Sequence, residues 1–532
     1  MALNRRDFSK LLLVSTAGLA LPGTGFAQSD TPVRGGTLNW VYTLEPGSAL
    51  FAINTSSGTG QAIGPKVVEG LLDFDYDLNP RPLLATEWSV SEDGLRYTFK
   101  LREGVKWHDG EDFTSEDVAF SLFRLKEAHP RGSITYQNLV EVETPDPHTA
   151  VVVLSAPAPY LITAQSSRES PIVPKHIFEK LAPQDGQTLE TAIGTGPFRL
   201  VEWVPGSHLI FERNEDYWDE GKPYLDRLIL RIITDPAARA AALETGEIDI
   251  GSNPVPLSDL DRLRSHPDLV VDETIYPYDG QQQQLFFNFD RPIWQDRNVR
   301  LAVAKAIDLE AFVDVVTYGT ALVSPSPIAV TLTQFNDPSI SQHEFDPAEA
   351  ERLLDEAGYP RGADGFRFPA QLLYNTFLPP SYAEFIRNAL RGIGINAEIN
   401  ALDLPTYLRT VYGDRDFDLT VESLSNLFDP TLGVQRAYWS QNIKKGTPFS
   451  NAAGYANPEV DALLEAAAVE IDPDKRRELW IEFQNIIHDE VASVDLIVPG
   501  SQIVANKRVK NFVTGGQGIS WSFAEIWIDP NA

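Results

Sequence analysis

The chain has 532 residues, of which 43% are apolar and 10% aromatic, and its formal net charge is −31 at pH 7. This composition predicts a globular protein, and the length predicts two or three lobes because it exceeds what one hydrophobic core fills. The negative charge argues against nucleic acid and anionic lipid as partners. The sequence has no cysteine, which excludes disulfides, thiolate metal sites and a cysteine nucleophile.

The N-terminus has the pattern of an export signal. Arg5 and Arg6 precede an apolar run over 11–21, and small residues follow as far as Ala27. This order predicts a secretory signal peptide over 1–27, and the arginine pair indicates the twin-arginine route. The alternative is an uncleaved membrane anchor, but the apolar run is shorter than the roughly 20 residues that a span needs. We therefore expect a periplasmic protein.

Strand signals alternate with turns in the first part of the mature chain. Residues 37–42 predict a strand, and 96–102 alternate polar and apolar residues as a half-buried strand does. Thr114 is followed three residues later by Asp117, which predicts a capping box at the start of a helix.

The rest of the chain mixes helices and strands. A helix is predicted over 236–246, where Gly246 ends it, and a short strand over 247–250. Apolar spacing predicts further helices and strands, the helices at 299–317, 346–357, 380–391, 458–470 and 474–489 and the strands at 285–289 and 417–421. This mixture predicts an α/β fold.

Several short segments occur in order along the chain. They are Gly35-Gly-Thr-Leu38, Val68-Glu-Gly-Leu-Leu-Asp-Phe74, Pro82-Leu-Leu-Ala-Thr-Glu-Trp88, the long segment 97–118, Gly194-Thr-Gly-Pro-Phe198, Arg213-Asn-Glu-Asp-Tyr-Trp218, 299–308 and 455–461. Together they resemble the family-5 bacterial extracellular solute-binding proteins, the group of the dipeptide-, oligopeptide- and nickel-binding proteins of ABC transporters.

The resemblance implies a large clamp of the periplasmic-binding-protein type, with mixed sheets, three subdomains and a hinge between two lobes. Lobe I is expected in pieces: 28–75, an extra subdomain at 76–193, then 194–286 and the C-terminal segment 505–532. Lobe II is expected at 287–504. The crossings between the lobes are expected near 279–289 and 504–509, with the ligand at the interface between the lobes.

The resemblance also implies the function. The chain is expected to be the periplasmic substrate-binding component of an ABC importer, a monomer that captures a peptide-like or modified small solute and delivers it to the permease subunits in the inner membrane. An opine, an oligosaccharide or a metal chelate is the alternative ligand. No enzyme motif, such as Gly-x-Ser-x-Gly, His-Glu-x-x-His or a Walker loop, occurs, so we expect no catalytic residue and no cofactor; a hydrolase on the same scaffold is the remaining rival. The eight histidines are scattered, so we expect no metal site.

The ligand site is expected in two regions. In the peptide-binding members a lobe II carboxylate binds the ligand's ammonium group, and here the matching position is Asn426, four residues before Pro430. A neutral amide lacks charge assistance, so a free N-terminal amine is not expected as the recognised group. Asp429 is a substitute, although it also suits the turn before Pro430. Glu422 is a second substitute.

Further contacts are expected from Ser57, Gly58 and Thr59 in a lobe I loop, for which an ordinary loop before a helix is the alternative. Arg436, Tyr438 and Trp439 are offered as a carboxylate clamp and stacking groups, with core or surface packing as the alternative. His108, Gly194, Gly196 and Asp308 are expected to be structural, as scaffold, turn and cap residues.

Overall fold

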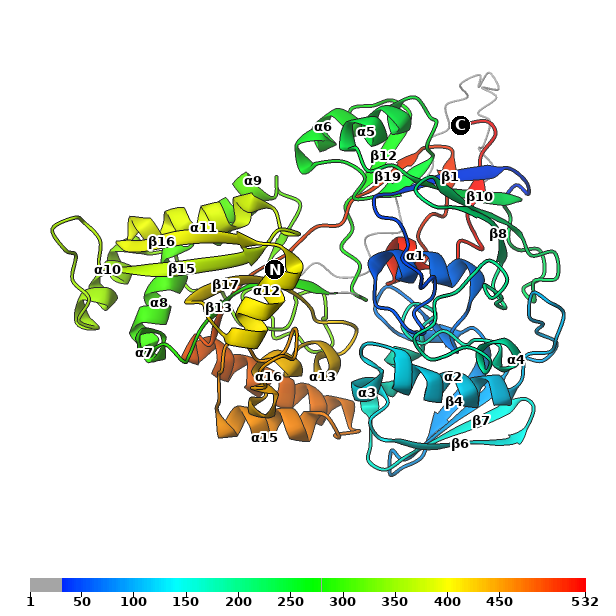
Figure 1. Ribbon diagram of the computed structural model, residues 1–532, viewed down its shortest axis with the longest axis horizontal. Helices are drawn as coiled ribbons and strands as arrows, with labels where there is room; N and C mark the ends of the chain where they lie inside the picture. Colours follow the sequence, from blue (N-terminus) through cyan, green and yellow to red (C-terminus); the bar gives the residue numbers. More distant parts are fainter. Residues whose placement is uncertain (1–30, 279) are drawn as a thin grey trace, which may run out of the picture. The chain divides into compact units, whose positions relative to one another are not determined.

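Residues 31–278 and 280–532 are described by the computed structural model, and three sheets organise them (Figure 1). The predicted signal peptide lies outside the described residues. Within the described ranges, no helix is both long and apolar enough to cross a membrane.

Lobe I is built on a seven-stranded mixed sheet. In order across the sheet its strands are β12 (Leu269–Asp272), β19 (Ile503–Asn506), β11 (Ile250–Ser252), β1 (Thr37–Tyr42), β10 (Arg227–Ile232), β9 (His208–Arg213) and β8 (Phe198–Val204). β1 is parallel to both of its neighbours, β10 and β11, and the remaining pairs are antiparallel. The helices of this lobe are α1 (Gly58–Val67), α4 (Lys175–Phe178), α5 (Pro236–Glu244) and α6 (Leu260–Arg264).

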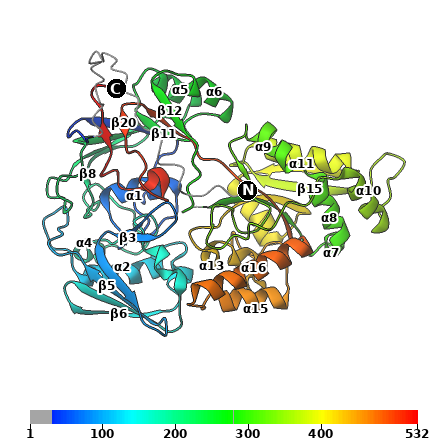
Figure 2. The same ribbon diagram turned by 180° about the vertical axis from the view of Figure 1, so that it is seen from behind.

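The extra subdomain is a four-stranded antiparallel sheet with a covering helix. Its strands are β4 (Ala85–Val90), β5 (Arg96–Leu101), β7 (Thr149–Leu154) and β6 (Leu139–Asp146), and its helices are α2 (Ser115–Ala128) and α3 (Gly132–Thr135). The predicted capping box opens α2: the Asp117 carboxylate accepts the Thr114 N–H at 2.9 Å. Figure 2 shows this sheet below α1.

Lobe II is built on a six-stranded mixed sheet. Its strands, in order, are β14 (Leu322–Val323), β18 (Ser493–Val498), β13 (Gln281–Phe287), β17 (Leu419–Ser425), β15 (Phe368–Asn375) and β16 (Ile395–Leu402). Its helices are α7 (Pro292–Gln295), α8 (Arg297–Ala306), α9 (Leu309–Val316), α10 (Pro347–Glu356), α11 (Pro380–Gly392), α12 (Leu404–Tyr407), α13 (Pro430–Gly433), α14 (Gln435–Tyr438), α15 (Pro458–Ala467) and α16 (Pro473–Glu490). Two short ladders complete the fold, β2 (Leu72–Phe74) with β3 (Pro80–Pro82) and β20 (Val509–Lys510) with β21 (Trp527–Ile528).

The sheets place the lobe crossings differently from the expected positions. Residues 281–286, expected in lobe I, belong to β13, which pairs with β17 and β18 of lobe II. Ile503 and Val504, expected in lobe II, belong to β19 of the lobe I sheet. The four glutamines 281–284 do not form an apolar strand pattern, yet they lie in β13. Their side chains form hydrogen bonds within lobe II; Gln284, for example, donates to the Tyr438 hydroxyl at 2.8 Å.

Most predicted elements are confirmed, with differences in their bounds, of which two change the local structure. The helix expected over 299–317 is two helices, α8 and α9, and Asp308 begins the second by accepting the Ala311 N–H at 3.0 Å. Its expected role as a cap is therefore confirmed. The strand expected over 247–250 lies at β11 instead, where it pairs with β1 and β19.

Candidate functional site

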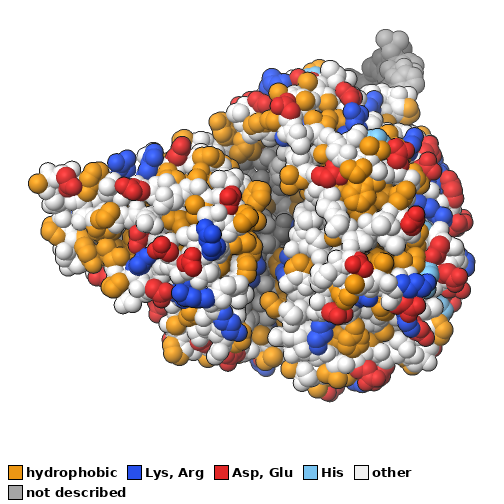
Figure 3. All heavy atoms as spheres, in the orientation of Figure 1, with side chains coloured by type: hydrophobic (Ala, Val, Ile, Leu, Met, Phe, Trp, Pro, Cys, Tyr) orange, Lys and Arg blue, Asp and Glu red, His pale blue; other side chains and the backbone are white. Residues whose placement is uncertain are grey.

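A cavity with a volume of about 840 Å³ lies where the chain crosses between the lobes. The surface is hollowed between the two lobes on this face (Figure 3). The lining of the cavity comes from lobe I, from both crossings and from lobe II. Its residues include Tyr42, Gly58, Arg168, Ser252–Ser258 except Pro254, Ile275, Tyr276, Gln281, Tyr318, Phe377, Tyr382, Val498–Ile503 and Gln517–Ser520. A cavity of this size at a domain interface is typical of a small-molecule site.

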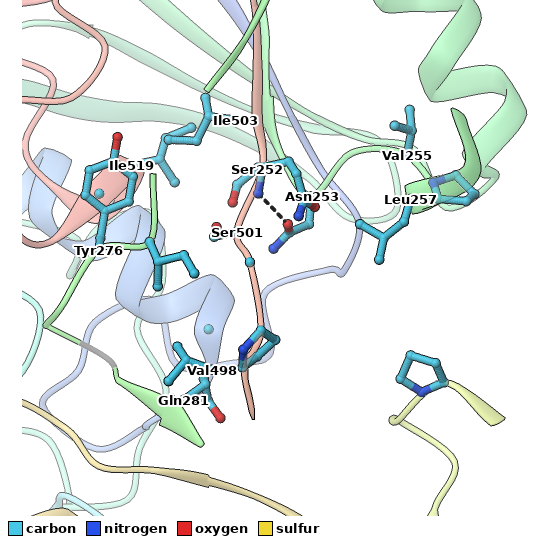
Figure 4. A pocket seen from close by; sticks show the side chains of 18 of the residues that line it. Ser252, Asn253, Val255, Leu257, Tyr276, Gln281, Val498, Ser501, Ile503 and Ile519 are labelled. Atoms are coloured by element: carbon cyan, nitrogen blue, oxygen red, sulfur yellow. Dashed lines mark hydrogen bonds between the residues drawn. The ribbon is translucent and has the colours of Figure 1, made fainter. Parts of the chain in front are cut away.

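Two loops that line the cavity are joined to each other by hydrogen bonds. Asn253, directly after β11, donates its backbone N–H to the Gln502 carbonyl at 2.7 Å, and its side-chain oxygen accepts the Gln502 N–H at 2.9 Å. The Asn253 φ of 45° is left-handed, a conformation that asparagine tolerates better than most residues. The pairing fixes one lobe I wall against the second crossing (Figure 4).

The start of α1 contributes a second wall. The exposed Ser57 caps the helix, and its hydroxyl accepts the Gly60 N–H at 3.1 Å. Gly58 lines the cavity, and a Cβ there would lie 3.3 Å from the Tyr42 hydroxyl, so a side chain would crowd this wall. Thr59 is buried and is not part of the lining.

The third lobe I element beside the cavity is the C-terminal segment 517–520, which the buried Lys66 holds in place. The Lys66 ammonium donates to the carbonyls of Ile519 at 3.0 Å and Trp521 at 2.5 Å, and it lies 3.7 Å from the centre of the Phe523 ring. Burial lowers the pKa of Lys66 well below its ordinary value.

Charge is scarce in the cavity. Arg168 is the one charged side chain among the described lining residues, and it donates to the Gln61 side-chain oxygen at 3.2 Å. The remaining lining consists of hydroxyl, amide, aromatic and aliphatic groups. Such a surface suits a solute with amide or hydroxyl groups and some apolar area, and it offers hydrogen bonds rather than counter-charges.

Asn426 lies beside the first crossing but outside the cavity lining. Its side chain is 1% exposed, and its oxygen accepts the Ala329 N–H at 2.5 Å. Its own N–H donates to the carbonyl of Gly280, which does line the cavity. In this structure Asn426 therefore joins two loops, and a contact with the ligand stays a prediction.

The other predicted lobe II residues also have partners within the protein. Asp429 begins α13 by accepting the Thr431 N–H at 2.9 Å, and it forms a buried ion pair with Arg476. Tyr438 is buried, and its hydroxyl is bonded to Gln284 and to Ser493.

Arg436 and Trp439 are half-buried. Arg436 donates to the carbonyls of Gly433 and Ser425, and burial lowers the pKa of its guanidinium to about 10. Trp439 donates to the Glu465 carboxylate at 3.1 Å. Of all the predicted site residues the structure brings only Gly58 to the described cavity lining.

Most of the cavity lining was not predicted from the sequence. The segments 252–258, 498–503 and 517–520 come from three distant parts of the chain. Apart from strand ends and short 3₁₀ turns they are loops with no periodic pattern. The available signal is local: Gly, Ser, Asn and Pro cluster at 251–256 directly after a predicted strand, which marks a loop at the edge of a sheet.

The segments that carried the family resemblance meet in lobe I around one buried carboxylate. Glu69 accepts hydrogen bonds from Thr195 at 2.8 Å, Tyr217 at 2.8 Å and Trp218 at 2.9 Å. Burial, which these three donors only partly offset, raises the pKa of Glu69 to about 7. Three segments far apart in sequence thus stabilise one another away from the cavity.

His108 and the glycines of 194–196 form a second scaffold contact. The buried His108 ring is bonded to the Gly196 carbonyl at 2.9 Å and to the Gly194 N–H at 3.3 Å. A Cβ at Gly194 would lie 1.8 Å from the Val67 carbonyl oxygen, so this close approach requires glycine. Their expected structural roles are confirmed. Among the described residues no group of three or more acidic or histidine side chains is placed to hold a metal ion.

A family model for bacterial extracellular solute-binding proteins, family 5, matches residues 79–446. The chain belongs to this family. This family-5 protein is 29% identical over 494 residues to the glutathione-binding protein GsiB of Salmonella typhi, covering 91% of this chain and 92% of the relative. It is 30% identical over 528 residues to a Brucella ovis protein assigned as an ABC transporter peptide-binding protein, covering 96% and 95%.

A solved structure gives the same assignment. The periplasmic binding protein DppA of Helicobacter pylori, in complex with the peptide STSA, matches with a TM-score of 0.77 at 26% identity and covers 93% of this chain and 99% of its own. The family-5 protein therefore has the two-lobed fold of periplasmic binding proteins, and it is a substrate-binding component of the ABC-importer type. The family and these relatives are binding proteins rather than enzymes.

Proposed function

We propose that this protein captures a peptide-like or modified small solute in the cleft between its lobes and releases it, chemically unchanged, to the permease of an ABC importer. The observation that carries the proposal is the position of the 840 Å³ cavity at both crossings, with walls from both lobes. A solute there contacts both lobes, so binding favours the closed arrangement. The glutathione- and peptide-binding relatives support a solute rich in amide groups.

The proposal is tested with protein purified from its native host. Mass spectrometry of the solute released on denaturation identifies the ligand, and small-angle scattering at saturating ligand measures closure. We expect a smaller radius of gyration and a higher melting temperature with ligand, because a ligand of the native state stabilises it by mass action. The solute should be recovered intact after prolonged incubation; its conversion would show an enzyme instead.

We further propose that the protein reaches the periplasm through the twin-arginine route, with cleavage after Ala27. The family is periplasmic, and the pair Arg5–Arg6 is the feature that such a receptor would recognise. Replacing both arginines by lysine keeps the charge, and we expect the precursor to accumulate in the cytoplasm. Normal export of the double variant would contradict this route without affecting the proposed binding function.

A further inference from the structure

Two large aromatic side chains stand exposed at the lobe II side of the cavity. Phe377 is 75% exposed and Tyr318 is 55% exposed, and both are part of the lining. The lobe I loop after β11 adds the partly buried Leu257 to the lining, beside the buried Val255 (Figure 4). Exposed apolar groups gathered at one cavity are typical of a binding surface because covering them removes apolar area from water.

The backbone at Tyr318 is in a conformation that disfavours an aromatic residue. Its φ is 54°, in the left-handed region, and Gly319 follows with a φ of 73°. Both residues come after Thr317, the residue that caps the end of α9, and the Gly319 N–H donates to the Val313 carbonyl at 3.0 Å. A bulky side chain is strained in this region, and glycine would avoid the strain. Strain of this kind is a reason to look for a role of the side chain in binding.

Phe377 is held at the same cavity by a turn. It follows β15, and its N–H donates to the side-chain oxygen of Asn375 at 3.1 Å, while the Leu378 N–H donates to the Asn375 carbonyl at 3.0 Å. The backbone is thus fixed by two hydrogen bonds, whereas the ring itself is left uncovered. The fixed backbone keeps the ring at the cavity, so a ligand that covers it has only the side-chain rotamer left to order.

We propose that the solute carries an aromatic or branched aliphatic group, and that this group is covered at the cavity mouth by Leu257 of lobe I and by Tyr318 and Phe377 of lobe II. The polar part of the solute then faces the serine, asparagine and glutamine groups of the same cavity. This inference rests on the proposed function, because it takes the interlobe cavity as the solute site, and it adds the chemical class of one part of the solute.

The first test uses an apolar dye, anilinonaphthalene sulfonate, with four proteins: the wild type, Tyr318→Gly, Phe377→Ala and the control Phe345→Ala. Phe345 is 45% exposed and lies outside the cavity lining, so it matches the loss of an exposed ring elsewhere. We expect the dye to bind the wild type and the control alike, and to bind each mouth variant about tenfold more weakly. Tyr318→Gly also relieves the strain of a tyrosine in the left-handed region, so the melting temperature of this variant should not fall. A loss of dye binding in this variant is then not a result of unfolding.

The second test compares acetyl-Gly-Phe-amide with acetyl-Gly-Ala-amide by calorimetry. We expect the wild type to prefer the phenylalanine compound by about tenfold, and Phe377→Ala to lose most of that preference. Equal dye binding by all four proteins, or no dye binding by the wild type, would overturn the proposal of an apolar mouth. If the mouth variants lose the dye but neither compound binds the wild type, the apolar mouth stands and the peptide-like solute of the proposed function is wrong.

Discussion

The carboxylate of Asp429 and the guanidinium of Arg476 form a two-point ion pair, with contacts of 2.7 Å and 2.8 Å between their oxygen and nitrogen atoms. Both side chains are almost fully buried, at 3% and 6% exposure. Arg476 also donates to the Thr431 hydroxyl and to the Ala467 carbonyl, and so joins α13 to α15. Such a pair holds the helical layer of lobe II together.

We expect Asp429→Asn to destabilise the protein strongly, since it leaves a buried guanidinium without its counter-charge. Loss of one partner of a buried pair costs about 3–5 kcal/mol in the free energy of unfolding. Denaturant unfolding measures the change, with the exposed Lys475→Ala as control. A near-normal unfolding midpoint together with lost ligand binding would instead show that Asp429 contacts the solute.

Local chemistry made much of the fold predictable. The strand 37–42 and the capping box of Thr114 and Asp117 depend on side chains within a few residues, and both are confirmed. The break between α8 and α9 was missed because apolar spacing continues across it, while the cap that divides the helices is one aspartate, Asp308. The first lobe crossing was misplaced because β13 begins with four glutamines, whose hydrogen-bond partners lie elsewhere in lobe II. The second was misplaced because Ile503 and Val504 pair within the lobe I sheet as part of β19.

The site was much less predictable than the fold. Asn426 was located by its distance from Pro430 along the chain, but in space its side chain bonds Ala329 rather than lining the cavity. The real lining combines loops more than two hundred residues apart, such as Asn253 with Gln502. Their contact is a consequence of β11 pairing with β19, which no local pattern in either segment encodes.

The pH dependence of stability should reflect the buried carboxyl of Glu422. Burial raises its pKa to about 7 from an ordinary 4.5, although the hydroxyls of Tyr407 and Tyr412 donate to it. The folded state therefore binds this proton more tightly than the unfolded state, so its contribution to stability falls as pH rises from about 4.5 through 7.

We expect Glu422→Gln to remove this contribution. In the wild type, the second carboxylate oxygen of Glu422 has no hydrogen-bond partner, so placing the glutamine's amide nitrogen at that position breaks no existing hydrogen bond. Relative to the wild type, the variant should melt higher at pH 8 and show no such advantage at pH 5. Buried histidines such as His108, whose pKa burial lowers to about 4, act in the opposite sense. Both proteins contain them, so their contribution cancels when the two are compared. A constant difference between the two proteins at all pH values, as expected for the exposed control Glu478→Gln, would contradict the assignment.

Lys66 should affect binding through the cavity wall rather than by contact with the solute. In Lys66→Met the carbonyls of Ile519 and Trp521 lose their donor, and an unsatisfied buried polar group costs about 1–3 kcal/mol. We expect a lower melting temperature and a weaker affinity for the solute that co-purifies with the wild type. Hydrogen exchange should increase at 517–521; unchanged exchange there would show that other contacts hold the wall.

The final prediction concerns selectivity for a free amine. Among the described lining residues the charged side chain is Arg168, a cation, and Asn426 supplies no charge. A buried ammonium without a counter-charge is costly, and a charge-assisted hydrogen bond contributes roughly 1.5–3 kcal/mol. Without such a hydrogen bond, the affinity for the ammonium group is lower by about tenfold to over a hundredfold. We therefore expect di- and tripeptides with free N-termini to bind more weakly than their N-acetylated forms.

Calorimetry with paired free and N-acetylated peptides measures this difference. Submicromolar binding of a free peptide that is lost on acetylation would contradict the prediction and raise the question of which group binds the ammonium. Asp279→Asn then tests whether Asp279, an acid that lies outside the described residues, binds the ammonium group. Asp429→Asn tests the same role for Asp429, the substitute carboxylate offered by the sequence. If neither variant weakens the free peptide, the ammonium is held by hydrogen bonds to neutral groups, and the charge argument itself is wrong. If acetylated peptides bind more tightly, as we expect, Asn426→Asp tests whether position 426 reaches the solute. Unchanged affinity for free and acetylated peptides would show that the side chain serves only the Ala329 contact, and tighter binding of free peptides would show that it contacts the solute.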